Sequence, residues 1–529
     1  MSKLKEKIYI KQWLDLKPYN SQVPADSYYL KLCNDVKKSF ITSDQSFVFK
    51  GYLQEDEIDA LACFLTSYFE DIISGTNIWN SFIRVYKRLY GRYLPFYETG
   101  EYYEQEINLA DISFLIWYFM NTIQLERFIA PFNDFIIEAS VKIMDVFENA
   151  WEYAPENEFL KTFYSIDEKE TDFYKARILI DNLLFKSYLF YPDSLMDLRS
   201  SEIEVMEENK NDEHLINLLN ENRNNKLHTT YTRLLALKGQ QWMAEILGDN
   251  HSLSKQYSII SRKISGYFFY KGQDKENVFL EHIASGKKFN LTKKSFDHYD
   301  SLTDIDTILF MGIVQWRNEW WFSGVYFQAE FNPDLVLDEK NSISSRSAVS
   351  FLDHQNKDIE DMLDKQFKAF KKFNNNQQIA FMNSHKIEKF IEDYIEFFNN
   401  SLKLSRKEKD AAKKRAREDG FFGNEKDAVD FSGEPVDGLV FFNPQKGVEV
   451  AFEINSAFPM KDNSFFTSEE SRNHIMHLFC NEEFSTELVL FCIDNFKDDL
   501  KFFKTAEGKM LLDNIDFLLR FWKRGNYFT

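Results

Sequence analysis

The chain has 529 residues, of which 64 are Lys or Arg and 84 are Asp or Glu, so its formal net charge is −20. It contains only 18 glycines and 10 prolines, whereas 17% of its residues are aromatic. This composition excludes a disordered chain, a collagen-like chain and a general nucleic-acid coat protein. The scarcity of glycine and proline favours long helices, and the length predicts a multidomain protein of the α+β class.

The N-terminal segment lacks an apolar stretch followed by a small-residue cleavage site, so we expect no secretory signal. The longest apolar run, residues 114–120, is far shorter than the roughly 18 residues that a membrane span requires. The cysteines are scattered without a CxxC pair, at Cys33, Cys63, Cys480 and Cys492. These features predict a cytoplasmic protein with no membrane association and no disulfide scaffold.

The first half of the chain has the pattern of a helical protein. Residues 1–50 are predicted to form an N-terminal arm with short helices, because prolines and polar turns interrupt them. Residues 51–255 are predicted to form an all-helical domain, in which apolar residues recur at steps of three and four positions, as between Ile58 and Ile73. Gly75 is expected to end that helix in the left-handed conformation.

The pattern then changes from helices to strands. Residues 256–335 alternate between short apolar stretches and turn residues, which predicts strands. Residues 285–288 are typical of a hairpin turn. Five short antiparallel strands in this span suit a small β-barrel, because closure removes exposed strand edges.

The last third of the chain returns to helices. Residues 336–425 are predicted to form a helical connector that contains a basic segment at 403–417, with eight basic and two acidic residues. Residues 426–529 are predicted to form a small α+β domain. It opens with a hairpin around a turn at 443–447 and continues with helices.

An aromatic cluster lies in and after the last predicted hairpin of the barrel. Side chains alternate along a strand, so Trp320 and Phe322 share one face and Trp321 lies on the other. The interior of so small a barrel cannot hold both faces. Either another domain covers one face, or an aromatic surface is exposed to stack a base or to bind a peptide or a methylated cation. The candidate binding residues are Trp316, Trp320, Trp321 and Phe322.

Charge gives two opposing indications about nucleic acid. Residues 258–331 carry nine basic and nine acidic residues, a balance that argues against binding of a phosphate backbone. The segment 403–417 is typical of a solvated stretch, because it would be charged all round as a helix. The alternative is an electrostatic tether to nucleic acid or to an acidic partner. Its candidate residues are Lys413, Lys414, Arg415 and Arg417.

Two clusters of residues are candidate chemical sites. Asp437, Glu449 and Glu453 belong to the C-terminal hairpin, where paired acids can hold Mg²⁺ for nuclease chemistry. The Lys expected two residues after the second acid is missing, because Ala451 and Asn455 occupy those positions. Exposed, non-catalytic acids are the simpler interpretation.

The second cluster lies on one predicted helix, where His474, His477 and Cys480 follow one another at steps of three residues. This spacing can supply part of a zinc site. Core-type residues surround the three, and no fourth ligand is evident, so the spacing favours an ordinary packed helix. The sequence contains no phosphate-binding loop, no dinucleotide fingerprint and no hydrolase elbow, and we expect no cofactor.

Six short segments are considered together, at residues 8–14, 26–30, 153–157, 291–296, 318–321 and 516–523. They resemble a family of uncharacterised bacterial proteins found mainly in relatives of Bacteroides. The resemblance covers most of the chain and implies a bacterial, cytoplasmic protein. It supplies no catalytic residues.

These observations predict a non-catalytic binding or adaptor protein, whose partner is a protein bound by the aromatic barrel surface and by grooves between domains. The alternative is a divergent metal-dependent enzyme that processes nucleic acid with the acidic hairpin and the basic segment. A structural subunit of an obligate complex is a third hypothesis. An enzyme requires carboxylates that converge in a cleft, whereas an adaptor requires an exposed apolar patch.

Overall fold

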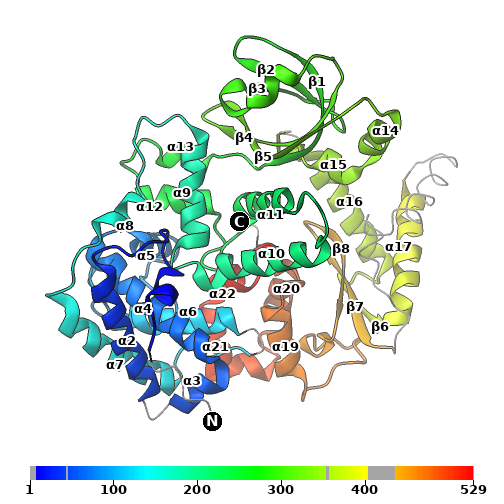
Figure 1. Ribbon diagram of the computed structural model, residues 1–529. Helices are drawn as coiled ribbons and strands as arrows, with labels where there is room; N and C mark the ends of the chain where they lie inside the picture. Colours follow the sequence, from blue (N-terminus) through cyan, green and yellow to red (C-terminus); the bar gives the residue numbers. More distant parts are fainter. Residues whose placement is uncertain (1–6, 43–45, 125–126, 353–356, 403–434, 528–529) are drawn as a thin grey trace. The chain divides into compact units, whose positions relative to one another are not determined.

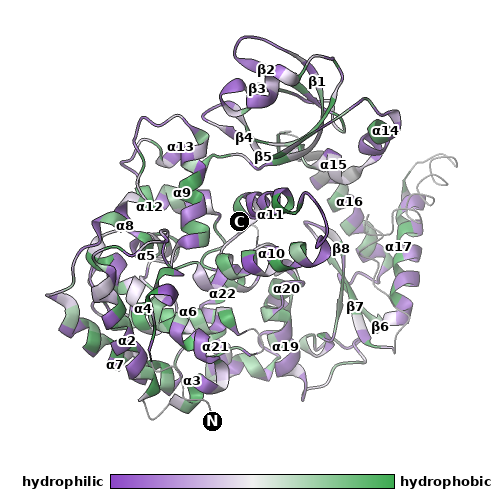
Figure 2. Ribbon diagram, viewed as in Figure 1, coloured by the Kyte–Doolittle hydropathy of each residue, from purple (hydrophilic) through white to green (hydrophobic). Residues whose placement is uncertain are grey.

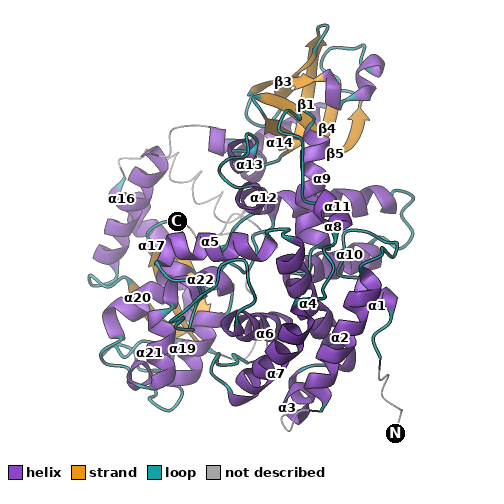
Figure 3. Cartoon of the chain, turned by 90° about the vertical axis from the view of Figure 1, so that its left-hand side faces the viewer, coloured by secondary structure: helices purple, strands orange, loops and turns teal. Residues whose placement is uncertain are grey.

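A computed structural model of the chain (Figure 1) describes residues 7–42, 46–124, 127–352, 357–402 and 435–527. The chain divides into two compact units, Met1–Asn341 and Ser342–Thr529. Helices and two sheets make up the fold (Figure 3), in agreement with the predicted mixed class. The finer division into five parts stays a prediction. Within the described part of the chain, no helix has the length and apolar character needed to cross a membrane.

The first unit begins with a helical region whose core lies around two apolar helices, α4 and α6. Leu61, Phe64 and Leu65 of α4 are fully buried, and Gly75 ends this helix with φ 65° in the left-handed conformation, as predicted. The helices are α1 (Ile10–Leu14), α2 (Asp26–Ile41), α3 (Ser46–Tyr52), α4 (Glu55–Ser74), α5 (Ile78–Tyr90), α6 (Leu109–Ile123), α7 (Asp134–Trp151), α8 (Glu158–Thr162), α9 (Phe173–Lys186), α10 (Met196–Glu208), α11 (Leu215–Thr229), α12 (Gly239–Leu247) and α13 (Ser254–Ser258).

The N-terminal segment differs from the predicted arm with short helices. Helix α2 has 16 residues and packs against α4 and α7. Its buried residues Tyr29, Leu32, Val36 and Phe40 recur at helical spacing. This periodicity begins after Pro18 and Pro24, so the prolines do not interrupt it and α2 packs as part of the helical core.

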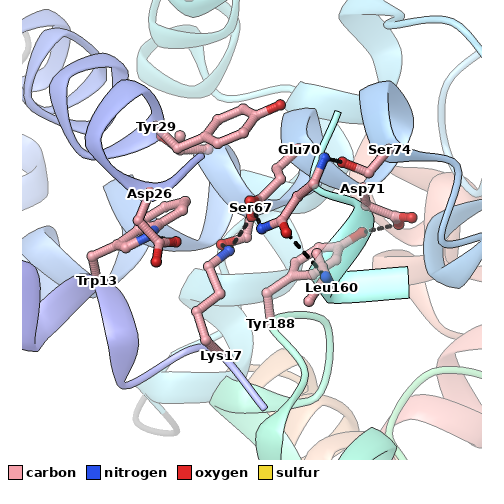
Figure 4. Close-up of polar contacts among 12 residues, drawn as sticks. Trp13, Lys17, Asp26, Tyr29, Ser67, Glu70, Asp71, Ser74, Leu160 and Tyr188 are labelled. Carbon is pink, nitrogen blue, oxygen red and sulfur yellow. Dashed lines mark hydrogen bonds and ion pairs between the residues drawn. The ribbon is translucent and has the colours of Figure 1, made fainter. Parts of the chain in front are cut away.

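A buried polar network holds the chain before α2 against α4 and α8 (Figure 4). Lys17 points toward α4, where its Nζ donates to Ser67 Oγ at 3.0 Å and forms an ion pair with Glu70. Asn157, which caps α8, donates to Glu70 Oε1 at 2.8 Å and to the Tyr19 hydroxyl at 3.0 Å. Breaking such a buried pair costs about 3–5 kcal/mol. These contacts fix the segment before α2 to α4 and α8.

The first unit continues with a five-stranded sheet that closes on itself. The hydrogen-bonded order is β1-β2-β3-β5-β4, and β1 also pairs with β4. All neighbours are antiparallel except β3 and β5, which run parallel and meet only at Leu291 and Trp320. Helix α14 (Pro333–Asn341) follows the sheet. The strands are β1 (Ile264–Gln273), β2 (Asn277–His282), β3 (Lys288–Thr292), β4 (Ile308–Trp316) and β5 (Glu319–Ala329).

The second unit contains a three-stranded antiparallel sheet with β7 in the centre. Phe442 of β7 packs in a core with Phe370 of α16 and Ile391 of α17, whereas Phe441 contacts Phe491 of α20 with ring centroids 5.4 Å apart. The elements are α15 (Ile343–Ser347), α16 (Lys357–Phe373), β6 (Ile379–Asn383), α17 (Ile387–Ser401), β7 (Asp437–Asn443), β8 (Gly447–Phe452), α19 (Ser471–Cys480), α20 (Thr486–Phe496), α21 (Ala506–Asp513) and α22 (Ile515–Trp522).

Candidate functional site

A groove of about 750 Å³ lies on the five-stranded sheet where β3 meets β5. It is lined by the loop between β1 and β2, by β3 and the short turn after it, and by the turn between β4 and β5. We call it the lysine groove, because its charged lining residues are four lysines and two glutamates. These are Lys275, Lys288, Lys293, Lys294, Glu276 and Glu319.

Backbone geometry explains how these segments converge. The turn between β4 and β5 contains Arg317 at φ 48° and Asn318 at φ 66°, and two consecutive left-handed residues are typical of the tightest hairpin turns. This turn directs Trp320 back toward β3, where it pairs with Leu291. The β3–β5 junction has this single bridging pair, and the groove lies beside it.

The lysines of the groove differ in their surroundings. Lys294 pairs with Glu319 at 2.8 Å, and both side chains are largely exposed. The Lys293 ammonium lies 4.3 Å from the centre of the Tyr299 ring. Lys275 and Lys288 are exposed and form no ion pair with any residue that the structure describes. The groove therefore carries an excess of positive charge, although residues 258–331 are neutral overall.

One aromatic side chain of the predicted cluster lines this groove. Trp320 is partly exposed and meets Phe289 edge to face, with ring centroids 4.9 Å apart. Phe289 is buried beneath it. Phe322, also partly exposed, packs against Phe296 at 5.6 Å. The indole of Trp320 is thus supported from below and accessible at the groove.

The other two tryptophans correct the predicted binding surface. Trp316 is 1% exposed and Trp321 is 3% exposed. Trp316 packs against Tyr257 of α13 at 5.4 Å, and Trp321 packs against Phe173 of α9 at 6.2 Å. These rings join the sheet to the helical region of the same unit, so they are not available to a partner.

The predicted basic segment at 403–417 is not among the residues that the structure describes. It contains Lys413, Lys414, Arg415 and Arg417. Their proposed contact with nucleic acid or with an acidic partner stays a prediction.

The acidic hairpin does not bring its three carboxylates together. Glu449 lies opposite Phe441 in the register of the hairpin, and its Oε1 and Oε2 accept hydrogen bonds from the backbone and hydroxyl of Ser485, at 2.9 and 2.5 Å. Asp437 and Glu453 lie at the far end, where the Glu453 N–H donates to the Asp437 carbonyl at 3.2 Å. Glu449 therefore stabilises the start of α20 and is separated from the other two acids.

The histidines of α19 also have separate partners. His474 Nδ1 accepts a hydrogen bond from the Ser456 N–H at 3.0 Å, and burial lowers the pKa of His474. His477 packs edge to face on Phe484 at 5.3 Å. Among the described residues, which include His474, His477 and Cys480, no group of three or more His, Cys, Asp or Glu is arranged to hold a metal ion.

Fold and site together describe a helical protein that carries a small closed sheet with a positively charged groove. Residues 7–269 match the model of a family described as "Protein of unknown function (DUF3843)". The match covers the helical region and ends within β1, so the lysine groove lies beyond it. This supports the expected resemblance to an uncharacterised domain family. No curated protein and no solved structure matches the chain.

Proposed function

We propose that the chain is a non-catalytic binding protein and that the lysine groove binds single-stranded nucleic acid. The observation that carries the proposal is the gathering of four lysines around the partly exposed ring of Trp320. Lysines neutralise phosphates, and an aromatic ring stacks on a base of any kind, so the combination fits a single strand. We also propose that the five-stranded sheet is a small β-barrel and that the protein is bacterial and cytoplasmic.

The place of the groove in the sheet supports the proposal. Five-stranded, partly open barrels of the OB type bind oligonucleotides on the face of strands 2 and 3 and on the loops that join strands 1 to 2 and 4 to 5. The lysine groove is lined by the first residue of β2, by β3 and by these two loops. The β3–β5 junction, with its single bridging pair, has the fewest paired residues of any junction in the closed sheet.

The charge distribution also favours binding of a single strand at the lysine groove over unspecific binding elsewhere on the surface. The net charge of −20 repels nucleic acid from most of the surface. The positive groove is a local exception. We therefore expect binding to be confined to the groove, to depend strongly on salt and to weaken for a duplex, whose bases cannot stack on Trp320.

The test is a fluorescence-anisotropy titration with a labelled oligonucleotide of about 15 nucleotides, within the size range of OB-type sites, at low and at physiological salt. We expect the double variant Lys275→Glu and Lys288→Glu to bind at least about tenfold more weakly and to show a smaller salt dependence, because two phosphate contacts are lost. The full chain is used throughout.

The matched control is Lys31→Glu with Lys38→Glu. These exposed lysines line a separate groove of about 540 Å³ between α2 and α7, and the substitutions change the net charge by the same amount. Unchanged affinity in this control places the ligand at the lysine groove. Equal losses in both variants, or an unmodified chain that binds no single strand, would overturn the proposal.

A further inference from the structure

We infer that the outward face of α10 is a docking strip for an amphipathic helix of a partner protein whose flanks are basic. The apolar strip consists of Met196, Ile203 and Met206, which are 37%, 52% and 40% exposed. It is independent of the lysine groove and is carried by the geometry of one helix hairpin. Figure 2 shows hydrophobic and hydrophilic residues together along α10.

The contacts of α10 define which side faces outward. Helices α10 and α11 lie side by side (Figure 1). The Asn222 amide donates to Ser201 Oγ at 3.0 Å, and Lys226 pairs with Asp197 at 3.0 Å. With 3.6 residues per turn, all three strip residues lie within about 40° of the direction opposite Ser201. The strip therefore faces away from α11.

Burial along α10 shows that no other element of the first unit covers Met196, Ile203 and Met206. Leu198 is the helix's one buried residue. Arg199 lies on the outward side between Met196 and Ile203, and its guanidinium group is 5.7 Å from the centre of the Tyr191 ring. A helix with apolar side chains on its exposed face gains free energy when a partner buries them.

The spacing of the strip identifies the shape of the partner. Its residues are separated by seven and then three positions, as at the a and d positions of a coiled coil. Glu202 and Glu207 flank the strip, about 60–80° to either side, at the positions that set charge complementarity between paired helices. Helix α10 carries five carboxylates and one arginine. The complementary partner is an amphipathic helix with leucine-type residues in the seam and Lys or Arg on both flanks.

The experiment uses a synthetic probe, a labelled helix of about three heptads with Leu in the seam and Lys on the flanks, titrated against the full chain. We expect Ile203→Ser with Met206→Ser to raise the Kd by about tenfold or more, because the seam contacts are lost. The matched control is Ile178→Ser on α9, an equally exposed isoleucine outside the strip (57%), and its Kd is expected to stay unchanged. Circular dichroism verifies that each variant is folded.

Two further arms separate docking from general attraction to an acidic protein. A scrambled peptide of the same composition is expected to bind at least about tenfold more weakly, because it cannot present a continuous seam. Glu202→Gln with Glu207→Gln is expected to weaken binding of the Leu/Lys helix by a few fold. Equal affinity of the scrambled and ordered peptides, equal affinity of all variants, or no binding of the probe would overturn the inference.

Discussion

The two faces of β5 carry similar aromatic residues with opposite roles. Trp321 and Ser323 point into the helical region, where Ser323 Oγ lies 3.1 Å from Asn224 Nδ2 and 3.2 Å from His228 Nε2. Trp320, one position away, is partly exposed at the lysine groove. A strand alternates its side chains, so one residue step separates an anchor from a candidate ligand contact. Residue type alone does not distinguish the two roles.

The largest expected effect tests the anchoring face. Replacing Trp321 with Ala removes the ring packed against Phe173 and Tyr174 and is expected to destabilise the first unit by about 3–5 kcal/mol. Calorimetry and amide hydrogen exchange in α9 and β5 measure the change. If exchange in both elements stays as slow as in the unmodified chain, the buried face does not anchor the sheet.

The next effect belongs to the open face. Trp320→Ala is expected to weaken binding of a single strand about tenfold, within the range of about 1–3 kcal/mol reported for a base stacked on an aromatic ring. Trp320→Phe keeps a stacking surface and is expected to retain most of the affinity. An alanine variant that binds as tightly as the unmodified chain would show that Trp320 does not contact the ligand.

A pH series distinguishes the faces a second way. Burial lowers the pKa of His228 behind β5 well below its usual 6.5. Below pH 6.5, His228 therefore binds a proton in the unfolded chain but stays neutral in the folded chain. The stability of the first unit consequently falls as the pH falls from 7 toward 5, by at most about 1.4 kcal/mol per pH unit. His228→Gln is expected to reduce this dependence in urea denaturation. A variant whose pH profile is the same as that of the unmodified chain would contradict the assignment.

The smallest expected effect concerns the charge of the groove. Glu319 is exposed and pairs with Lys294 at 2.8 Å, so Glu319→Gln is expected to change stability by less than about 1 kcal/mol. It removes a negative charge beside the ligand, and we expect the affinity for a single strand to rise about two- to threefold. An unchanged or lower affinity in the same titration would show that Glu319 does not face the phosphates.

The local sequence was sufficient to predict most of the helices and strands. All five strands of the closed sheet lie within the predicted span of 256–335, because turn residues separate short apolar stretches there. The hairpin of β7 and β8 and the helices α19 to α22 lie within the predicted α+β span of 426–529. Strand β6 was missed, because its five residues are too few to show the periodicity of a strand within a region of helical pattern.

The candidate site could not be predicted from the sequence without the fold. Counting nine basic and nine acidic residues argued against phosphate binding, yet closure of the sheet gathers Lys275 and Lys288 beside Trp320. Lys275 and Trp320 are far apart in sequence and line one groove, beside the point where β3 pairs with β5. Likewise, no local pattern predicts that Trp321 packs against Phe173, because the two residues are far apart in the sequence.

The most direct test of the central claim is photo-crosslinking of a single-stranded oligonucleotide that carries a photoreactive uracil, followed by mass spectrometry of the crosslinked peptides. We predict crosslinks to Trp320 and to residues 288–294, which disappear in the variant with Lys275→Glu and Lys288→Glu and persist in the control with Lys31→Glu and Lys38→Glu. Crosslinks confined to other parts of the chain, or equally strong crosslinks in both variants, would contradict the assignment of the lysine groove as the binding site.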